Sequence, residues 1–332
     1  MSLVPSPLRL PLTLFECHFQ LDGTARLPAY PGSAWRGAFG HALKRAVCVA
    51  RGTECPACLL YRTCAYPYIF ETPPPPDSLK MRRYTAAPHP FALRIDPRQS
   101  GPSYRLGLVL FGRADRYTPY VVHALAQAGQ AGLGRERQNF HLAEVTQATP
   151  PLFQVWRSIY APDRPLEVQV GCPPVIPEVP AACDICVETP LRLRHREHLV
   201  TPANFRFADL FGSLLRRVSM LTYFHTDIPL EADFAALSEA AESVPIHEPM
   251  LRWHDWTRYS SRQDTAMEMG GILGRFRLHG ADVEPFWPYL WLGQWTHAGK
   301  GTTMGLGRYH IAASTLPDSG SCGSDTWTAG PA

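Results

Sequence analysis

Hydrophobic and polar residues alternate along Phe15–Leu21, where the odd positions are apolar and the even positions are polar. This alternation predicts a β-strand with one buried face. After Ser33 apolar residues recur every three or four positions, which is typical of an amphipathic helix, here over residues 33–48 with Ser33 as its cap. The apolar face of this helix carries Trp35, Phe39, Ala42, Leu43 and Ala46.

The opposite face of this predicted helix is polar and mostly basic. It carries Arg36, Gly40, His41, Lys44 and Arg45. A histidine suits proton transfer, because its ordinary pKa lies near neutral pH. The alternative interpretation is a solvated helix face without a chemical role.

The first half continues with two further strands and one further helix. A cysteine-rich segment and the proline-rich loop ETPPPPDS interrupt the pattern after residue 48. A strong strand is then expected over Tyr104–Asp115, followed by a helix that begins at Thr118 and Pro119. A last strand is expected over residues 139–145.

The second half repeats this order of elements. Alternating residues predict strands over 183–194, 250–260, 271–280 and 308–314. Helical spacing predicts a long helix over 201–224 and a short aromatic helix over 284–295. The long helix has an apolar stripe of Phe207, Leu210, Phe211, Leu214, Val218 and Leu221.

Both halves are interpreted as the order β-α-β-β-α-β, the ferredoxin-like plan, which the cysteine-rich and proline-rich segments interrupt in the first half. The predicted fold is α+β, with tandem ferredoxin-like (RRM-like) domains and a cysteine-rich insertion that we expect to bind zinc. The tetrapeptide GLGR recurs at Gly132–Arg135 and Gly305–Arg308, each time between the second helix and the last strand. The expected boundaries are 1–148 for the first domain with its insertion at 48–103, 149–182 for a linker, 183–313 for the second domain and 314–332 for a disordered tail.

The composition of the chain bears on its expected ligands and its expected location in the cell. The chain has 332 residues and a net charge of +3, and its only lysines are Lys44, Lys80 and Lys300. Arginine suits phosphate and base edges, although a GC-rich genome would also explain this bias. We see no signal peptide and no apolar run long enough to span a membrane, so a cytoplasmic protein without a membrane partner is expected.

Four of the nine cysteines are close together, at Cys48, Cys55, Cys58 and Cys64. The central pair, CPAC, has the spacing of a zinc knuckle, and the flanking cysteines complete four sulfur ligands. A site with four protein ligands leaves no open coordination position, so the metal would be structural and not catalytic. A redox CxxC pair or four unrelated thiols are the alternatives.

The glycine-rich stretch GKGTTMGLGR, residues 299–308, suits a backbone that approaches phosphate. A nucleotide-binding P-loop would need Ser or Thr after its lysine, but Lys300 is followed by Gly301. The upstream Gly293 is also one residue too far from Gly299. The phosphate is therefore expected to belong to a nucleic acid.

Three groups of segments together resemble a known family and span about residues 12 to 312. The first is PGSAWRGAFGHALKRAVC running into CPACLLYRTCAYPYIFETP, and the second is YRLGLVLFGRA with GLGRERQNFHLAEV. The third comprises ETPLRLR, LFGSLLRRVSML, GGILGRFRLHG and GKGTTMGLGRYHI. They resemble the repeat-associated mysterious proteins (RAMPs) of CRISPR systems, and within that superfamily the endoribonuclease that processes the CRISPR precursor RNA.

This resemblance implies metal-independent RNA cleavage, in which a ribose 2′-hydroxyl attacks the phosphorus and leaves a 2′,3′-cyclic phosphate. In related enzymes a histidine on or near the first helix acts, often with a tyrosine and a lysine or arginine. On this chain the corresponding candidates are His41, Tyr30, Lys44 and Arg36, with His18 as the reserve histidine. No cofactor would be needed for catalysis.

The partner implied by the resemblance is CRISPR repeat RNA. The candidate RNA-binding residues lie in the glycine loop and on two strands: Gly299, Lys300, Gly301, Gly305, Gly307, Arg308, Arg192, Arg194, Arg275 and Arg277. A non-catalytic RNA-binding subunit of a CRISPR effector complex is the main alternative function. An enzyme whose chemistry centres on the cysteines is a third interpretation.

Overall fold

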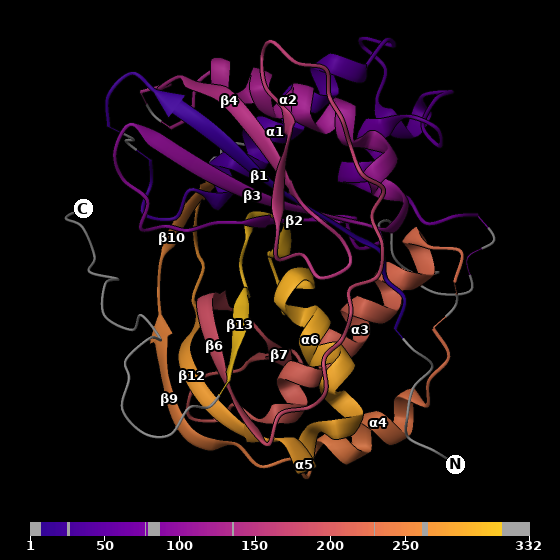
Figure 1. The fold of residues 1–332 in the computed structure, drawn as a ribbon, viewed down its shortest axis with the longest axis vertical. Coiled ribbons are helices and arrows are strands. Elements are labelled where there is room, and N and C mark those ends of the chain that lie inside the picture. Colours follow the sequence, from indigo (N-terminus) through magenta and orange to yellow (C-terminus); the bar gives the residue numbers. More distant parts are fainter. Residues whose placement is uncertain are drawn as a thin grey trace. The chain divides into compact units, whose positions relative to one another are not determined.

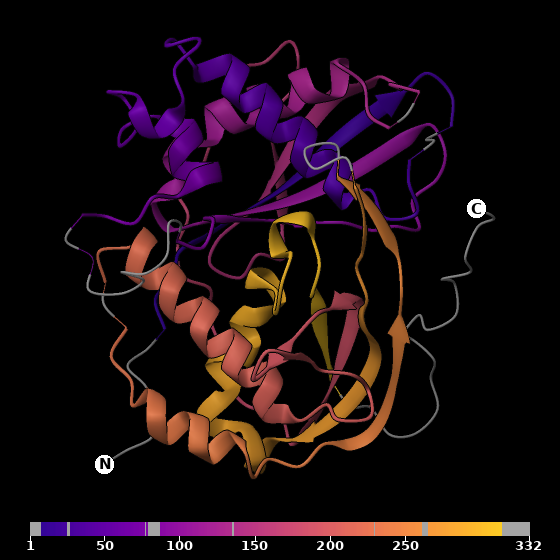
Figure 2. The same ribbon diagram turned by 180° about the vertical axis from the view of Figure 1, so that it is seen from behind.

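A computed structural model describes residues 8–24, 27–76, 78, 87–134, 136–228, 230–260 and 265–313 (Figures 1 and 2). The chain divides into two compact units. The N-terminal unit comprises Arg9–Val175 and Met220–Pro229, and the C-terminal unit comprises Met1–Leu8, Ile176–Ser219 and Leu230–Ala332. The predicted tail, 314–332, lies outside the described residues.

The N-terminal unit is built on a five-stranded antiparallel sheet with the order β2-β3-β1-β4-β5. Its strands are β1 (Leu12–Leu21), β2 (Phe91–Arg94), β3 (Ser103–Phe111), β4 (Phe140–Ala148) and β5 (Trp156–Tyr160). The first four strands have the ferredoxin-like arrangement, and β5 extends the edge beside β4. Both β2 and β5 fall where the sequence predicted an insertion and a linker, because short strands are defined by pairing with neighbours more than by their own pattern.

Helices α1 (Gly32–Val47) and α2 (Thr118–Gln130) cover one face of this sheet (Figure 1). The fully buried Trp35 of α1 packs on Phe19 of β1 and Phe140 of β4, with ring centroids 4.8 and 5.4 Å apart. These contacts explain the apolar stripe of α1, although Ala46 at its end is exposed. Three short helices complete the unit: η1 (Cys55–Ala57), η2 (Pro67–Glu71) and η3 (Gly112–Tyr117).

The C-terminal unit contains a four-stranded antiparallel sheet with the order β13-β6-β12-β9. Its strands are β6 (Ala182–Leu191), β9 (His247–His254), β12 (Gly271–His279) and β13 (Tyr309–Ala313). This order is again ferredoxin-like. Two small hairpins accompany it, formed by β7 (Arg194–His195) with β8 (His198–Leu199) and by β10 (Thr257–Ser260) with β11 (Thr265–Glu268).

Helices α3 (Phe207–His225) and α6 (Trp287–Thr296) pack against each other in this unit (Figure 2). Phe211 of α3 contacts Tyr289 of α6, with ring centroids 5.5 Å apart, and the predicted stripe of α3 is buried. The last turn of α3, from Met220, is grouped with the N-terminal unit. The shorter helices are α4 (Phe234–Ala241), α5 (Gly280–Val283), η4 (Glu284–Phe286) and η5 (Thr302–Met304).

The structure confirms the predicted α+β class with antiparallel sheets and corrects several boundaries. Helix α1 begins at Gly32 after Pro31, and α3 begins at Phe207, six residues later than the predicted 201. The predicted strand 250–260 divides into β9 and β10, because its two parts pair with different partners. None of the helices in the described ranges is long and apolar enough to cross a membrane.

Candidate functional site

His41 lies on the exposed side of α1 in the N-terminal unit. Arg45 follows one turn later and is also exposed, so the two side chains share one side of the helix. The opposite stripe, with Trp35 and Phe39, is fully buried. Packing of that stripe therefore fixes which side of α1 presents His41.

The other cations of α1 pack against the short helix η2. The guanidinium of Arg36 lies 5.5 Å from the ring centroid of Phe70, and the ammonium of Lys44 lies 5.4 Å from that of Tyr66. Between them, a Cβ atom added at Gly40 would lie only 3.0 Å from the Phe70 ring. The polar arc predicted from the sequence is therefore divided into a side that holds η2 and a side that carries His41.

Tyr30 lies immediately before α1 and is only 3% exposed. Its ring is part of the core of the N-terminal unit, whereas His41 is exposed. The structure thus brings Arg36 and Lys44 to η2 but does not place Tyr30 on the exposed side of α1.

The reserve candidate His18 lies on the face of the sheet away from α1. Its neighbours Cys17 and Phe19 are buried on the helix-covered face, and side chains alternate along β1. The His18 ring pairs with the hydroxyl of Thr146 at 3.3 Å. Because the sheet separates His18 from α1, the two histidines belong to different sites.

The glycine loop of the C-terminal unit is held by its own backbone. The amide of Gly299 donates to the Ser213 hydroxyl at 2.7 Å, that of Lys300 to the carbonyl of Arg192 at 3.0 Å, and that of Gly307 to the carbonyl of Pro190 at 3.1 Å. Two further loop amides, of Gly305 and Leu306, also donate within the loop. These amides serve the fold, which differs from the expectation that they would contact phosphate.

The backbone conformation and close packing of this loop explain why it contains glycine. Gly307 has a φ of 70°, and a Cβ atom there would overlap the carbonyl oxygen of Ala298. The loop turns back tightly onto β6, so residues 302–307 are buried. The side chain of Lys300, by contrast, is exposed and available to a ligand.

All five predicted RNA-binding arginines have partners within the C-terminal unit. Arg277 binds the carboxylates of Asp184 and Glu248, each at 2.9 Å. Arg194 in the β7–β8 hairpin pairs with Glu197 at 3.4 Å, and both are exposed. The remaining contacts are those of Arg192 with the carbonyl of Gly270, Arg275 with the sulfur of Met250, and Arg308 with Glu188.

Glu188 is the centre of a charged cluster that the sequence did not reveal. Its carboxylate accepts hydrogen bonds from Arg308 and from His310, the latter at 3.0 Å. Burial alone would raise the pKa of Glu188, but the hydrogen bond from His310 and the charge and hydrogen bond of Arg308 outweigh it and lower the pKa to about 2. The pairing of β6 with β13 brings these three residues together. Because this pairing joins segments far apart in the chain, the local sequence pattern could not reveal the cluster.

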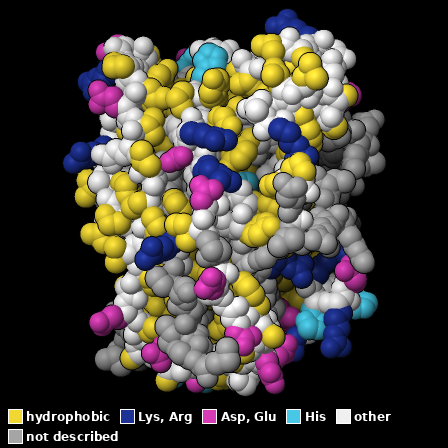
Figure 3. Space-filling view, turned by 90° about the vertical axis from the view of Figure 1, so that its right-hand side faces the viewer, with side chains coloured by type: hydrophobic (Ala, Val, Ile, Leu, Met, Phe, Trp, Pro, Cys, Tyr) yellow, Lys and Arg dark blue, Asp and Glu magenta, His cyan; other side chains and the backbone are white. Residues whose placement is uncertain are grey.

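Charges of both signs occur on the face drawn in Figure 3. On the face in Figure 3, the coloured residues show basic side chains scattered among acidic ones and not gathered into one continuous patch. This distribution agrees with the small net charge of +3.

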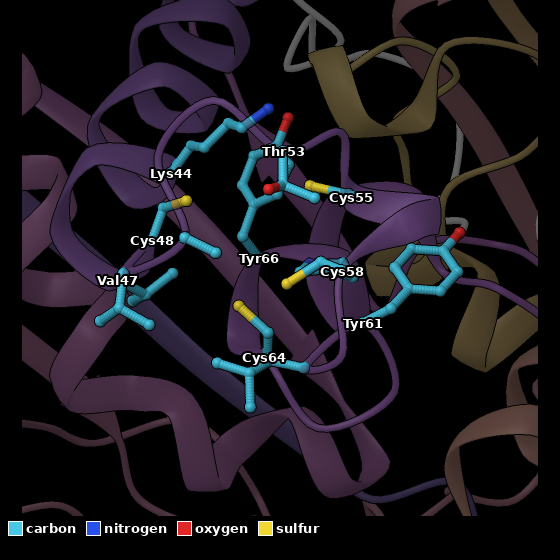
Figure 4. A pocket seen from close by; sticks show the side chains of 13 residues that line it. Lys44, Val47, Cys48, Thr53, Cys55, Cys58, Tyr61, Cys64 and Tyr66 are labelled. Atoms are coloured by element: carbon cyan, nitrogen blue, oxygen red, sulfur yellow. The ribbon is translucent and has the colours of Figure 1, made fainter.

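The four predicted metal ligands line one cavity in the N-terminal unit, with a volume of about 30 Å³ (Figure 4). Cys48, Cys55, Cys58 and Cys64 surround it together with Lys44 and Tyr66. Within the part of the chain that the structure describes, however, no group of three or more His, Cys, Asp or Glu side chains is close enough to hold a metal ion. The thiols share a cavity without forming a closed ligand set.

Comparison with known protein families gives two adjacent matches. Residues 185–309 match the family model of the CRISPR-associated endoribonuclease Cas6. Residues 185–309 are a Cas6 family domain. The family predicted from the sequence is thereby confirmed, and with it the enzyme class, since Cas6 proteins are endoribonucleases. Residues 10–170, which precede this Cas6 domain, match a family model of N-terminal domains named AF_1859_N.

Solved structures of Cas6 proteins share the fold. A Cas6 product complex has a TM-score of 0.56 and 19% identity, covering 91% of this chain and 99% of that one. Cas6 of Thermus thermophilus has a TM-score of 0.52 and 17% identity, with the same coverage. A partial Cas6-RT-Cas1–Cas2 complex has a TM-score of 0.56 and 15% identity, and the match covers 95% of this chain and 48% of that one. No curated protein sequence matches the chain.

Proposed function

We propose that this protein cleaves CRISPR precursor RNA within its repeats and releases mature guide RNA. The observation that carries the proposal is the exposed His41 on α1, in a chain whose second half is a Cas6 domain. Of the four side chains predicted to be catalytic, His41 is the exposed one, whereas Arg36 and Lys44 are half-buried and Tyr30 is buried. CRISPR repeat RNA is the proposed partner.

The proposed reaction needs no metal ion. The 2′-oxygen upstream of the scissile bond loses its proton and bonds to phosphorus, and the bond to the 5′-oxygen breaks. That oxygen takes up a proton, so the products are a 2′,3′-cyclic phosphate and a 5′-hydroxyl. His41 supplies one of the two proton transfers, for which imidazole is suited near neutral pH.

A cation must stabilise the negative charge that develops on the phosphorane oxygens. Arg45 is the exposed cation on the His41 side of α1. Arg36 and Lys44 lie half-buried against Phe70 and Tyr66, so their first task is to hold η2 beside α1. We assign Arg45 to the phosphate and the other two cations to positioning.

The test is cleavage of end-labelled repeat RNA in the presence of EDTA. We expect His41→Ala to slow cleavage by at least about a hundredfold, the usual scale for losing a general acid or base, while RNA affinity stays near normal. His123→Ala is the matched control, because His123 is an exposed histidine on the neighbouring helix α2. It should cleave like the unaltered protein.

Three further measurements separate the alternatives. A 2′-deoxy substitution upstream of the scissile phosphate should abolish cleavage, since it removes the nucleophile. Loss of cleavage in His18→Ala with full cleavage in His41→Ala would move the site to the other face of the sheet. Tight RNA binding without cleavage by the unaltered protein would make it a binding subunit and contradict the proposal.

A further inference from the structure

We propose that Cys48, Cys55, Cys58 and Cys64 bind one Zn²⁺ ion, which fastens the segment after α1 to helices α1 and η2. Each thiol lies at the end of a local element. Cys48 caps the C-terminus of α1, where its amide donates a hydrogen bond to the carbonyl of Lys44 at 2.9 Å, and Cys64 precedes η2. The inference concerns the N-terminal unit alone and does not depend on the proposed cleavage.

The central pair has the geometry of a metal-binding knuckle. Cys55 begins the short helix η1, and the amide of Cys58 closes the turn on the carbonyl of Cys55 at 3.0 Å. This turn keeps the two side chains on one side of the segment, as a CxxC chelate requires. Figure 4 shows Cys48, Cys55, Cys58 and Cys64 around the same space, with their sulfur atoms turned toward it.

The segment between Cys48 and Cys64 lacks an apolar core that could hold it in place. The structure describes every residue from 49 to 63, and among them only Cys55 is buried. Val49 is 79% exposed and Leu59 is fully exposed. Short segments of this kind need a disulfide or a metal to fix their conformation, and all four cysteines are free thiols in the structure.

The chemistry and the size of the cavity favour zinc. Four thiolates form a closed tetrahedral site, with Zn–S bonds of about 2.3 Å, and leave no position for substrate. A cavity of about 30 Å³ has room for roughly two water molecules, which is enough for a single ion. Lys44 borders the cavity, and its positive charge offsets part of the negative charge of a zinc tetrathiolate.

Loading would draw the thiols inward, because they do not form a ligand group as they stand. Metal binding commonly completes the folding of such segments, so we expect the four thiols to approach one another when the ion binds. The ion would then join the end of α1 to the start of η2, which Lys44 and Tyr66 already link by their 5.4 Å contact. The proposed zinc thereby positions α1 without touching a substrate.

The test begins with the metal content of the full chain, purified without chelators and measured by elemental mass spectrometry. We expect about one zinc per chain, falling below roughly a tenth of that in Cys58→Ala and Cys64→Ala. Cys172→Ala is the matched control, because Cys172 is a free, half-buried thiol of the same unit that lies away from the cavity. It should keep its zinc and its melting temperature, whereas the other two variants should melt earlier.

A second measurement uses the unaltered protein, in case the variants fail to fold. Replacing zinc by Co²⁺ should give the intense visible absorption of a tetrahedral cobalt thiolate site, and four thiols should be protected from alkylation until the metal is removed. Zinc far below one per chain, even after refolding with added Zn²⁺, would overturn the proposal. Iron with acid-labile sulfide, or a Cys55–Cys58 disulfide in the purified protein, would overturn it equally.

Discussion

Glu188 links the last strand of the C-terminal unit to the strand beside it. Its carboxylate accepts hydrogen bonds from Arg308, just before β13, and from His310 of β13. The hydroxyl of the neighbouring Thr189 donates to the carbonyl of Gly305 in the glycine loop at 2.7 Å. The residues that follow the glycine loop are therefore fixed by one carboxylate and one hydroxyl. Such a group matters for stability even where it touches no substrate.

The first prediction concerns the pH dependence that this carboxylate creates. The pKa of Glu188 is lowered from 4.5 to about 2, so below pH 4.5 the unfolded chain binds a proton that the folded chain does not. Its contribution is present above pH 4.5 and is lost as the pH falls toward 2. Glu188→Gln should lower the free energy of unfolding at neutral pH by about 1–3 kcal/mol and flatten its pH dependence between these values, as measured by urea denaturation.

Glu197→Gln is the control for this experiment. Its side chain is 93% exposed and its partner Arg194 is also exposed, so the change should cost at most about 0.5 kcal/mol. An equal decrease in the free energy of unfolding in both variants would show that the partly buried Glu188 stabilises the fold no more than an exposed carboxylate does.

At the scale of elements, the sequence predicted those helices in which apolar residues recur with a regular helical period. The stripe of α3 was identified correctly because its burial follows a helical period over several turns. Strand β2 has only four residues in a proline-rich region, and its pairing with β3 decides its conformation. Helix α4 was missed although Asp233 caps it, accepting from the amide of Ala236, because a single cap is a weak signal.

The candidate site was predicted only in part, for a related reason. Helical spacing alone placed His41 among cations on α1. It could not show that η2, more than twenty residues later, covers the side with Arg36 and Lys44, because that contact is non-local. Gly40 was the available hint, since a residue without a side chain at the centre of a polar arc marks close packing.

The second prediction tests this contact between elements. Phe70 is 9% exposed, and its ring packs on Phe39 of α1 at a centroid distance of 5.0 Å as well as under Arg36. Phe70→Ala should lower the free energy of unfolding by about 3–5 kcal/mol through the cavity it leaves. If η2 positions α1, cleavage by the variant should also slow at temperatures where it remains folded, as checked by circular dichroism beside the RNA assay. Full cleavage by a folded variant would show that α1 holds its position without η2.

At the scale of the whole molecule, some of the basic residues that the composition counts are already paired with carboxylates. The chain has 32 basic and 29 acidic residues, and several of its arginines are held by carboxylates within the C-terminal unit. Sequence composition counts these arginines as available to RNA. Their partners, Asp184 and Glu188, come from a strand that lies far away in the chain, so only the folded structure shows which cations remain exposed.

The third prediction follows from that distinction. Each phosphate contact made by a cation releases counterions, so the logarithm of RNA affinity falls with the logarithm of salt concentration. Lys300 is exposed at the glycine loop, and Lys300→Ala should weaken repeat-RNA binding and reduce this slope by about one. Arg277→Gln is the control, because Arg277 already holds Asp184 and Glu248, and it should change stability more than slope. A slope that changes with Arg277 and not with Lys300 would mean that the ion pairs open when RNA binds, and the strand would then replace the loop as the surface that contacts phosphate.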